Sequence, residues 1–121
     1  MKNQFFWKRL TFAVLGIRAT IRSEASFRAQ LFLGLAAAVV LALVRPPPIW
    51  IAMCCMSASM VLALELVNTA LERLADRLHP ERHVAIQKAK DCAAAAVLLA
   101  SIAAVIIGCL TVAVGLGWLK T

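Results

Sequence analysis

The sequence has no glycine-rich loop of the kind that cradles nucleotide phosphates. Its five glycines are dispersed along 121 residues, and none forms a GxxxxGK motif completed by serine or threonine. The HRD and DFG signatures of protein kinases are missing too. These two absences exclude the P-loop fold and the known folds of soluble kinases.

The cysteines form no CxxC motif and no pattern of paired cysteine and histidine ligands. Three of the four lie within apolar runs, and the fourth stands at the start of one. A disulfide framework or a zinc site is therefore not expected, and we interpret these residues as small apolar side chains. They are Cys54, Cys55, Cys92 and Cys109.

Polar residues are scarce throughout the chain. Hydrophobic residues make up 63% of the sequence, and its mean hydropathy is +0.86. Soluble domains have roughly 45–50% apolar residues, and a chain this short cannot bury such an excess in a core of its own. A secretory signal peptide would place one apolar stretch near the start, whereas here the apolar runs continue to the C-terminus. The sequence therefore predicts a single membrane domain over residues 1–121.

Acidic residues are outnumbered by basic residues, with 6 against 13 and a formal net charge of +7. In a soluble protein this charge would suggest nucleic acid as a partner. Here the basic residues flank apolar runs, which favours contact with anionic lipid headgroups instead. We expect the membrane, and no nucleic acid, as a partner.

The hydrophobic pattern predicts an all-α membrane protein with an N-terminal amphipathic surface helix and three transmembrane helices. The surface helix is expected over residues 1–28 because apolar residues recur there at helical spacing among basic ones. A plain cytoplasmic extension is the alternative for this segment. The three spans are expected at residues 29–45, 48–78 and 81–119, the last two with cytoplasmic extensions.

Prolines mark the ends of the first two spans. The first apolar run, residues 31–44, stops at Arg45 and three prolines, and the second helix stops at His79-Pro80. The first run is short for the roughly 20 residues that cross a bilayer. Either residues of the preceding helix contribute to this span, or the membrane thins locally.

The basic residues predict the orientation in the membrane. Only Arg45 and Lys120 lie on one side, so the positive-inside rule makes the N-terminus cytoplasmic and the C-terminus external. The other side has two groups: Lys2, Lys8, Arg9, Arg18, Arg22 and Arg28 before the first span, and Arg73, Arg77, Arg82, Lys88 and Lys90 between the second and third.

Four polar residues, spaced by three, four and four positions, fall on one stripe of the second span. This stripe starts inside the apolar segment and emerges on the cytoplasmic side. A carboxylate at the centre of a span costs roughly 2.5–3.5 kcal/mol, less near the interface, so it usually marks a function or a polar contact between helices. The stripe consists of Glu65, Asn68, Glu72 and Asp76.

Carboxylates that meet at the membrane interface can bind a metal ion or accept a proton. Together with Glu24, which stands where the surface helix approaches the first span, the stripe could bind Mg²⁺ that shares nucleotide phosphates. A further carboxylate could take a proton from a hydroxyl nucleophile. Lys90 and Asp91 stand just before the third span, where Lys90 could face phosphates. The alternative is that Glu72, Asp76, Lys90 and Asp91 are ordinary solvated helix ends.

Three segments resemble one known family over nearly the whole chain. The sequence Glu65-Leu-Val-Asn-Thr-Ala-Leu-Glu72 is followed about twenty residues later by Ala89-Lys90-Asp91 and an alanine-rich run to Leu99. Before them stand Gly16-Ile-Arg18 and Ser23-Glu-Ala-Ser-Phe-Arg28. These motifs are similar to those of the small bacterial membrane diacylglycerol kinases and undecaprenol kinases.

The resemblance implies an ATP-dependent lipid kinase that acts as a homotrimer in the bacterial inner membrane, with active sites at subunit boundaries. It implies that Glu65 is the general base for the lipid hydroxyl and that Glu24 and Glu72 hold Mg²⁺. Arg18, Glu65 and Asn68 would contact the lipid. The positions implied for ATP are Phe12, Glu24, Glu72, Glu81, Arg82, His83, Lys90 and Asp91.

The chain departs from the family pattern at a few positions that bear on the substrate. Phe5 and Phe12 stand where diacylglycerol kinases have an arginine and a tyrosine, and Lys8 or Arg9 could replace the arginine. Gln30 stands where the two branches have a carboxylate or a histidine. Diacylglycerol is the favoured substrate, and undecaprenol is the alternative.

Two functions of other classes remain open at this stage. In a non-catalytic membrane subunit, Glu65 and Asn68 would hold helices together through hydrogen bonds. In a proton-coupled carrier, Glu65 would be the titrating group. Neither explains why Glu24, Glu72 and Lys90 would converge at one membrane depth.

Overall fold

The chain is all-helical in the computed structural model, which describes residues 2–120 and their side chains from residue 5 onward. Its helices are α1 (Lys2–Ser23), α2 (Ala25–Val44), α3 (Pro48–Leu78) and α4 (Val84–Gly115). The predicted start of the surface helix, Met1, and the side chain of Lys2 used in the orientation argument lie outside the described residues.

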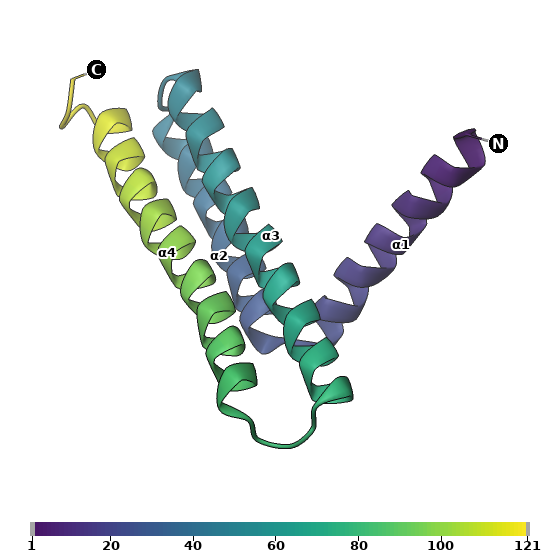
Figure 1. Ribbon diagram of the computed structural model, residues 1–121. Helices are drawn as coiled ribbons and strands as arrows, with labels where there is room; N and C mark the ends of the chain where they lie inside the picture. The colour runs from purple at the N-terminus through teal and green to yellow at the C-terminus, as the bar shows by residue number, and fades with distance from the viewer. Residues whose placement is uncertain (1, 121) are drawn as a thin grey trace.

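Three of the helices form a bundle from which the first diverges (Figure 1). Helices α2, α3 and α4 run side by side, and α3 packs most extensively against α4. The junction of α1 with α2 lies at the same end of the bundle as the connection from α3 to α4. The polar residues of the site are therefore gathered toward one end of the bundle.

Helices α2, α3 and α4 are each long and apolar enough to cross a membrane. The shortest, α2, has 20 residues, which at a rise of 1.5 Å per residue span about 30 Å, the thickness of the hydrocarbon core. The expectation of an all-helical membrane protein with three such helices is confirmed.

The break between α1 and α2 lies at Glu24, whereas the sequence placed the end of the first helix at residue 28. Glu24 has an extended backbone (φ −115°, ψ 111°), and helix α2 begins at the next residue. The Arg28 guanidinium donates hydrogen bonds to the carbonyl oxygens of Ile21 (2.8 Å) and Arg22 (3.1 Å), which satisfies the end of α1. Residues 25–28 therefore belong to α2, which has 20 residues.

Prolines determine the other helix ends as expected. Arg45 closes α2 in a left-handed conformation (φ 54°, ψ 58°), and Pro48 begins α3, where a missing amide hydrogen leaves no bond unmade. The last helix is shorter than the predicted segment 81–119, because His83 caps its start and the chain turns after Gly115.

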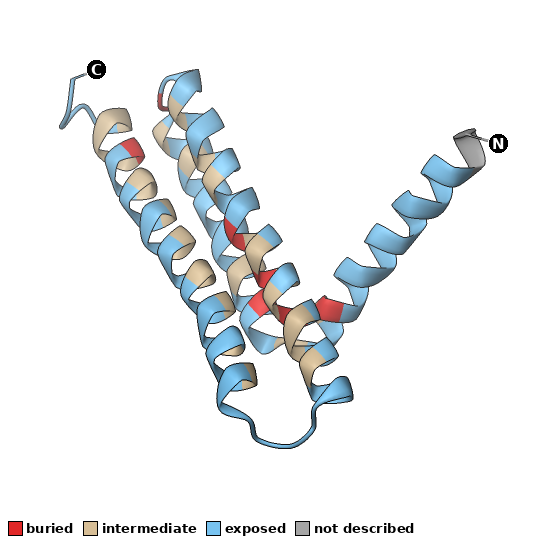
Figure 2. Ribbon diagram, viewed as in Figure 1, coloured by how far each residue is buried: buried red, intermediate tan, exposed pale blue. Residues whose placement is uncertain are grey.

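Few side chains are buried within one chain (Figure 2). Among the described side chains, Phe27 (2% exposed) and Val61 (8% exposed) are the large apolar residues that are buried. Long apolar faces of every helix stay exposed. A bundle with so small a core depends on lipid or on other copies of the chain to cover those faces.

Close contacts at the far end of the bundle join α4 to its neighbours. The Cys54 sulfur and the Thr111 hydroxyl of α3 and α4 lie 3.2 Å apart, and Thr111 also donates to the Ile107 carbonyl oxygen. Gly115 lies against Val44 of α2, so closely that an added Cβ would stand 2.0 Å from the Val44 Cγ1 atom. Small side chains therefore set the distance between helices there.

Candidate active site at the junction of the first three helices

A line of three buried residues on α3 faces the junction of α1 and α2. Val61, Glu65 and Thr69 follow one another every four residues, and each is less than 9% exposed. This spacing keeps their side chains on one face of the helix. The predicted polar stripe is thus buried at Glu65, half-buried at Asn68 and Glu72, and exposed at Asp76.

The Glu65 carboxylate is held by a hydrogen bond from another helix. The Ser26 hydroxyl, in the first turn of α2, donates to Glu65 Oε1 across 2.7 Å. Glu65 is only 6% exposed, and this is the one hydrogen bond that its carboxylate makes within the described residues. One carboxylate oxygen therefore accepts a hydrogen bond, and the other has no partner within the described residues.

Two amide side chains near this pair have a buried oxygen without a partner. Asn68 lies three residues after Glu65 on α3, and Gln30 lies four residues after Ser26 on α2. Neither the Asn68 Oδ1 atom nor the Gln30 Oε1 atom accepts a hydrogen bond within the described part of the chain. Buried polar atoms in proteins are nearly always paired, so these oxygens point to a donor supplied from outside this chain.

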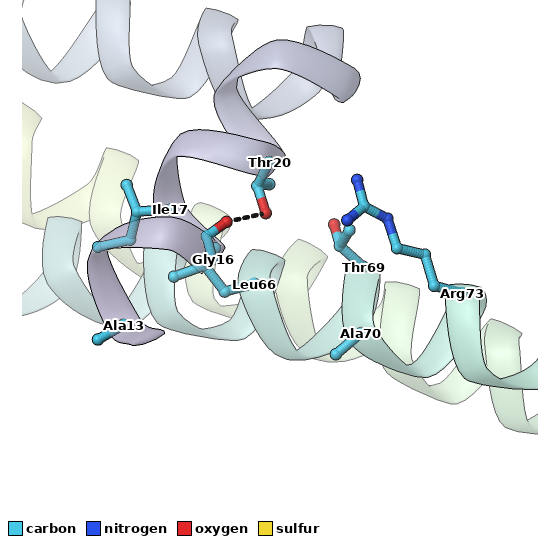
Figure 3. Close-up of a pocket in the computed structure, with 8 residues that line it drawn as sticks. All are labelled: Ala13, Gly16, Ile17, Thr20, Leu66, Thr69, Ala70 and Arg73. Carbon is cyan, nitrogen blue, oxygen red and sulfur yellow. Dashed lines mark hydrogen bonds between the residues drawn. The ribbon is translucent and has the colours of Figure 1, made fainter. Parts of the chain in front are cut away.

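The last turns of α1 pack against α3 beside the buried line (Figure 3). Thr20 is 4% exposed and donates to the Gly16 carbonyl oxygen across 2.9 Å. Arg73 donates to the Ser23 hydroxyl and so ties α3 to the last residue of α1. A pocket of about 340 Å³ lies between these helices, with Thr69 and Arg73 among its lining residues. The α1–α2 junction is thereby fixed to the middle and end of α3.

The two predicted metal ligands lie on segments that this contact brings together. Glu24 follows Ser23, and Glu72 precedes Arg73, the residue that bonds to it. Neither carboxylate has a hydrogen bond or ion pair within the described residues, where no three histidine, cysteine or acidic residues are grouped. Two carboxylates still suit Mg²⁺, which commonly takes one or two and completes its shell with water and phosphate oxygens.

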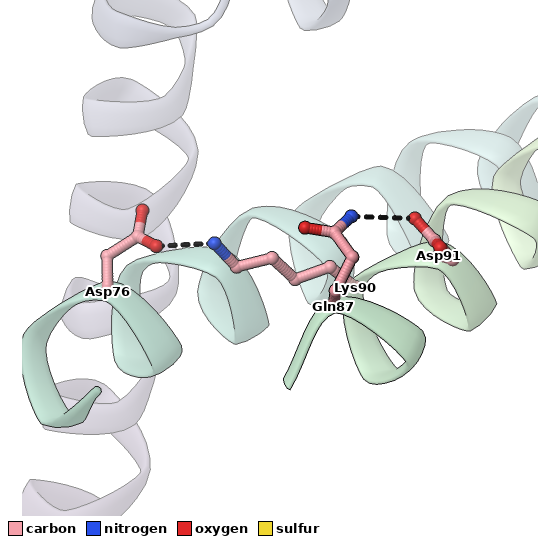
Figure 4. Close-up of polar contacts among 4 residues, drawn as sticks. All are labelled: Asp76, Gln87, Lys90 and Asp91. Carbon is pink, nitrogen blue, oxygen red and sulfur yellow. Dashed lines mark hydrogen bonds and ion pairs between the residues drawn. The ribbon is translucent and has the colours of Figure 1, made fainter. Parts of the chain in front are cut away.

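The last turns of α3 and the first turns of α4 are joined by an ion pair (Figure 4). The Lys90 ammonium group lies 2.5 Å from Asp76 Oδ1, and Lys90 is 27% exposed against 66% for Asp76. Asp91 accepts a hydrogen bond from Gln87 across 2.9 Å. An exposed pair of this kind contributes little to stability, about 0–1 kcal/mol, so Lys90 exchanges partners at low cost.

The remaining residues predicted to bind ATP or lipid are not brought to this junction within one chain. His83 caps α4, because its Nδ1 atom accepts a hydrogen bond from the Ala85 amide across 3.1 Å. Glu81 and Arg82 are exposed in the connection before α4. On α1, Arg18 is exposed and Phe12 is 66% exposed.

Several residues of the junction were missed by sequence reasoning. Ser26 and Thr69 were read only as parts of motifs, and Arg73 only as a basic flank of a span. Thr20 was not considered. Ser26 and Glu65 are 39 positions apart in the sequence, and no pattern in one sequence links them. The spacing of Thr69 four residues after Glu65 was the one usable signal.

Known proteins resemble this chain over most of its length. Residues 11–112 match the sequence model of the family described as prokaryotic diacylglycerol kinase. A diacylglycerol kinase of Synechocystis sp. is 40% identical over 98 residues, which make up 80% of this chain and 56% of that protein. A diacylglycerol kinase of Escherichia coli K12 is 36% identical over 95 residues, or 78% of each chain. One of Haemophilus influenzae is 32% identical over 89 residues, covering 74% of this chain and 75% of its own. This chain thus spans little more than half of the Synechocystis relative.

Proposed function

Because this chain belongs to the prokaryotic diacylglycerol kinase family, a family of lipid kinases, we propose that it phosphorylates diacylglycerol with ATP and yields phosphatidic acid. The observation that supports this proposal best is the buried Glu65 carboxylate, which has one oxygen hydrogen-bonded and one free. A carboxylate at this depth meets a hydroxyl that arrives from the bilayer and accepts its proton.

In the proposed mechanism, Glu65 takes the proton of the lipid hydroxyl while the hydroxyl oxygen attacks the γ-phosphorus of ATP. The bond from the γ-phosphorus to the β–γ bridging oxygen breaks, and ADP leaves with that oxygen. Asn68, with a buried oxygen that has no partner in one chain, accepts a hydrogen bond that orients the lipid headgroup. Glu24 and Glu72 would hold Mg²⁺, which when bound neutralises charge on the phosphates. Phosphoryl transfer depends mostly on this kind of positioning and charge neutralisation.

In this proposal Lys90 provides positive charge for the nucleotide phosphates. Its ion pair with the exposed Asp76 leaves the ammonium group near the cytoplasmic end of α3, on the side where Glu72 emerges. We further propose that Phe12, Glu81, Arg82, His83 and Asp91 approach the nucleotide and that Arg18 approaches the lipid. Since one chain does not bring these residues together, the complete site would need another subunit.

The proposed assembly is a homotrimer in the bacterial inner membrane, with the amphipathic α1 on the cytoplasmic surface and the N-terminus inside. The small buried core and the long exposed apolar faces of α2, α3 and α4 support association with further copies. The charge distribution supports the orientation. Native mass spectrometry in detergent, together with labelling of residues on each side of the membrane, tests both parts.

The test of the activity is a transfer assay with the purified full-length chain in lipid bicelles. Radiolabelled ATP is supplied with diacylglycerol, with undecaprenol, or with no lipid alcohol, and labelled lipid is measured. We expect phosphatidic acid as the main product and loss of labelling in the Glu65→Gln variant. A preference for undecaprenol would show that undecaprenol, and not diacylglycerol, is the substrate. If no phosphate is transferred to any lipid alcohol, the result would support a non-catalytic subunit, in which Glu65 and Ser26 only join two helices.

A further inference from the structure

We infer that Ser26 is a positioning residue for the proposed reaction: it holds one oxygen of the Glu65 carboxylate so that the other faces the lipid hydroxyl. This inference rests on the proposed function, because it assigns Ser26 a role in the step that Glu65 performs. It concerns a residue to which the sequence alone gave no role.

The contact has the geometry of a hydroxyl–carboxylate hydrogen bond between two helices. Its length, 2.7 Å between the Ser26 hydroxyl oxygen and Glu65 Oε1, is at the upper end of the range of about 2.5–2.7 Å for hydroxyl–carboxylate bonds. The bond occupies Glu65 Oε1 and leaves Oε2 without a partner among the described residues, so it selects the oxygen that faces the lipid hydroxyl in the proposed reaction.

The surroundings of the pair make this bond decisive for the position of Glu65. The glutamate side chain has three rotatable bonds, and at 6% exposure it has little water to hydrogen-bond. Ser26 provides the one hydrogen bond to this carboxylate among the described residues. A buried catalytic group that is held by a single bond loses its alignment when that bond is removed, and small misplacements cost much of the rate.

The backbone around Ser26 is itself fixed, so the hydroxyl is a rigid donor. The next residue, Phe27, is 2% exposed and anchors the first turn of α2. Arg28 bonds to two carbonyl oxygens at the end of α1, and Ser23 bonds to Arg73 of α3. The first turn of α2 is thus clamped from both sides of the Glu24 break.

The test compares Ser26→Ala, Ser26→Thr and a matched control in the full-length protein. Ser57→Ala serves as the control because the Ser57 hydroxyl bonds to a carbonyl oxygen of its own helix, that of Cys54. We expect Ser26→Ala to lower kcat roughly tenfold, with the KM values for ATP and lipid unchanged within about twofold. Ser26→Thr, which keeps the hydroxyl, should restore most of kcat, and Ser57→Ala should leave it unchanged.

Two further measurements separate positioning from a loss of folding. In the Glu65→Gln background, Ser26→Ala should produce no additional loss of the residual activity, since the two residues act as a unit. The infrared band of the Glu65 carboxylate, assigned by its absence in Glu65→Gln, should shift in Ser26→Ala and not in Ser57→Ala. An equal loss of activity in both backgrounds, or an unshifted band in an active protein, would overturn the inference.

The outcomes also distinguish this inference from the proposed function. If the wild-type protein is active and Ser26→Ala keeps full kcat, the role of Ser26 is refuted and the proposed function stands. If the wild-type protein transfers phosphate to no lipid alcohol although the band shifts in Ser26→Ala, the hydrogen bond is real. In that case the proposed function is refuted, and the positioning role is refuted with it.

Discussion

Replacing Glu65 and Glu72 one at a time with glutamine separates a proton acceptor from a metal ligand. Seven residues at a rise of 1.5 Å place the two positions about 10 Å apart along α3. Each change keeps the size of the side chain and removes one negative charge. We expect Glu65→Gln to lower the rate of lipid phosphorylation by roughly 10²–10⁴ while nucleotide binding persists, and Glu72→Gln to weaken both.

The size of the difference follows from the separation of the two carboxylates. A unit charge about 4 Å from a nucleotide-bound cation contributes about 4 kcal/mol at an effective dielectric constant of about 20, and one about 10 Å away contributes about 1.7 kcal/mol. The difference of about 2.3 kcal/mol corresponds to roughly 40-fold in affinity. Loss of a general base typically lowers kcat by roughly 10²–10⁴.

The fold should survive the change at Glu65. Glutamine keeps a carbonyl oxygen for the Ser26 hydroxyl, so a hydrogen bond to a charged acceptor is replaced by one to a neutral acceptor. The exchange costs about 1 kcal/mol of hydrogen-bond energy, and removal of a buried charge offsets part of it. Lost activity in this variant therefore reports on chemistry.

The assay pairs two measurements on each variant in bicelles. The affinity for a non-hydrolysable ATP analogue is measured by equilibrium dialysis with Mg²⁺, and the initial rate of lipid phosphorylation is measured at saturating ATP. If Glu65→Gln loses nucleotide affinity as severely as Glu72→Gln, Glu65 belongs to the metal site, and the base must be sought elsewhere.

Three other expectations concern the metal, the nucleotide and the helix packing. Glu24→Gln should raise the Mg²⁺ concentration for half-maximal activity roughly tenfold while the oligomer stays folded; near-normal turnover at limiting Mg²⁺ would contradict its role. Lys90→Ala should raise the KM for ATP roughly tenfold with little change in the KM for lipid, and steady-state kinetics would show the reverse if Lys90 served the lipid. Gly115→Ala should destabilise the protein by about 1–3 kcal/mol, because its Cβ would stand 2.0 Å from a methyl carbon of Val44. Thermal unfolding in detergent should show partial rescue by Val44→Ala, and no destabilisation by Gly108→Ala, whose Cβ would meet nothing within 4 Å.

The spans and their ends could be read from the sequence because local chemistry determines them. Long apolar runs give the three helices, and Pro48 and the His79-Pro80 pair bound α3, since proline starts a helix well and cannot continue one. The break at Glu24 could not be read in this way. No proline or glycine marks it, and the bonds of Arg28 and Arg73 that support it join residues on different helices.

In the candidate site, too, local chemistry made one residue predictable, and contacts between helices made another unpredictable. Glu65 stood out because a carboxylate within an apolar run is costly, and its burial on α3 agrees with that expectation. Its partner Ser26 is an ordinary residue in sequence, since a serine in the first turn of a helix has many local uses. Only the packing of α2 against α3 gives that hydroxyl its partner.

The single non-helical residue between α1 and α2 also restricts how the length of this chain can vary. Because an α-helix turns about 100° per residue, one residue inserted or deleted at Glu24 would rotate α1 by that angle relative to α2. Thr20 would then leave its buried position, and the contact between Ser23 and Arg73 would be lost. The connection over residues 79–83 is exposed and sets no such rotation between two packed helices, so we expect a change of length there to disturb the helix packing less than one at Glu24.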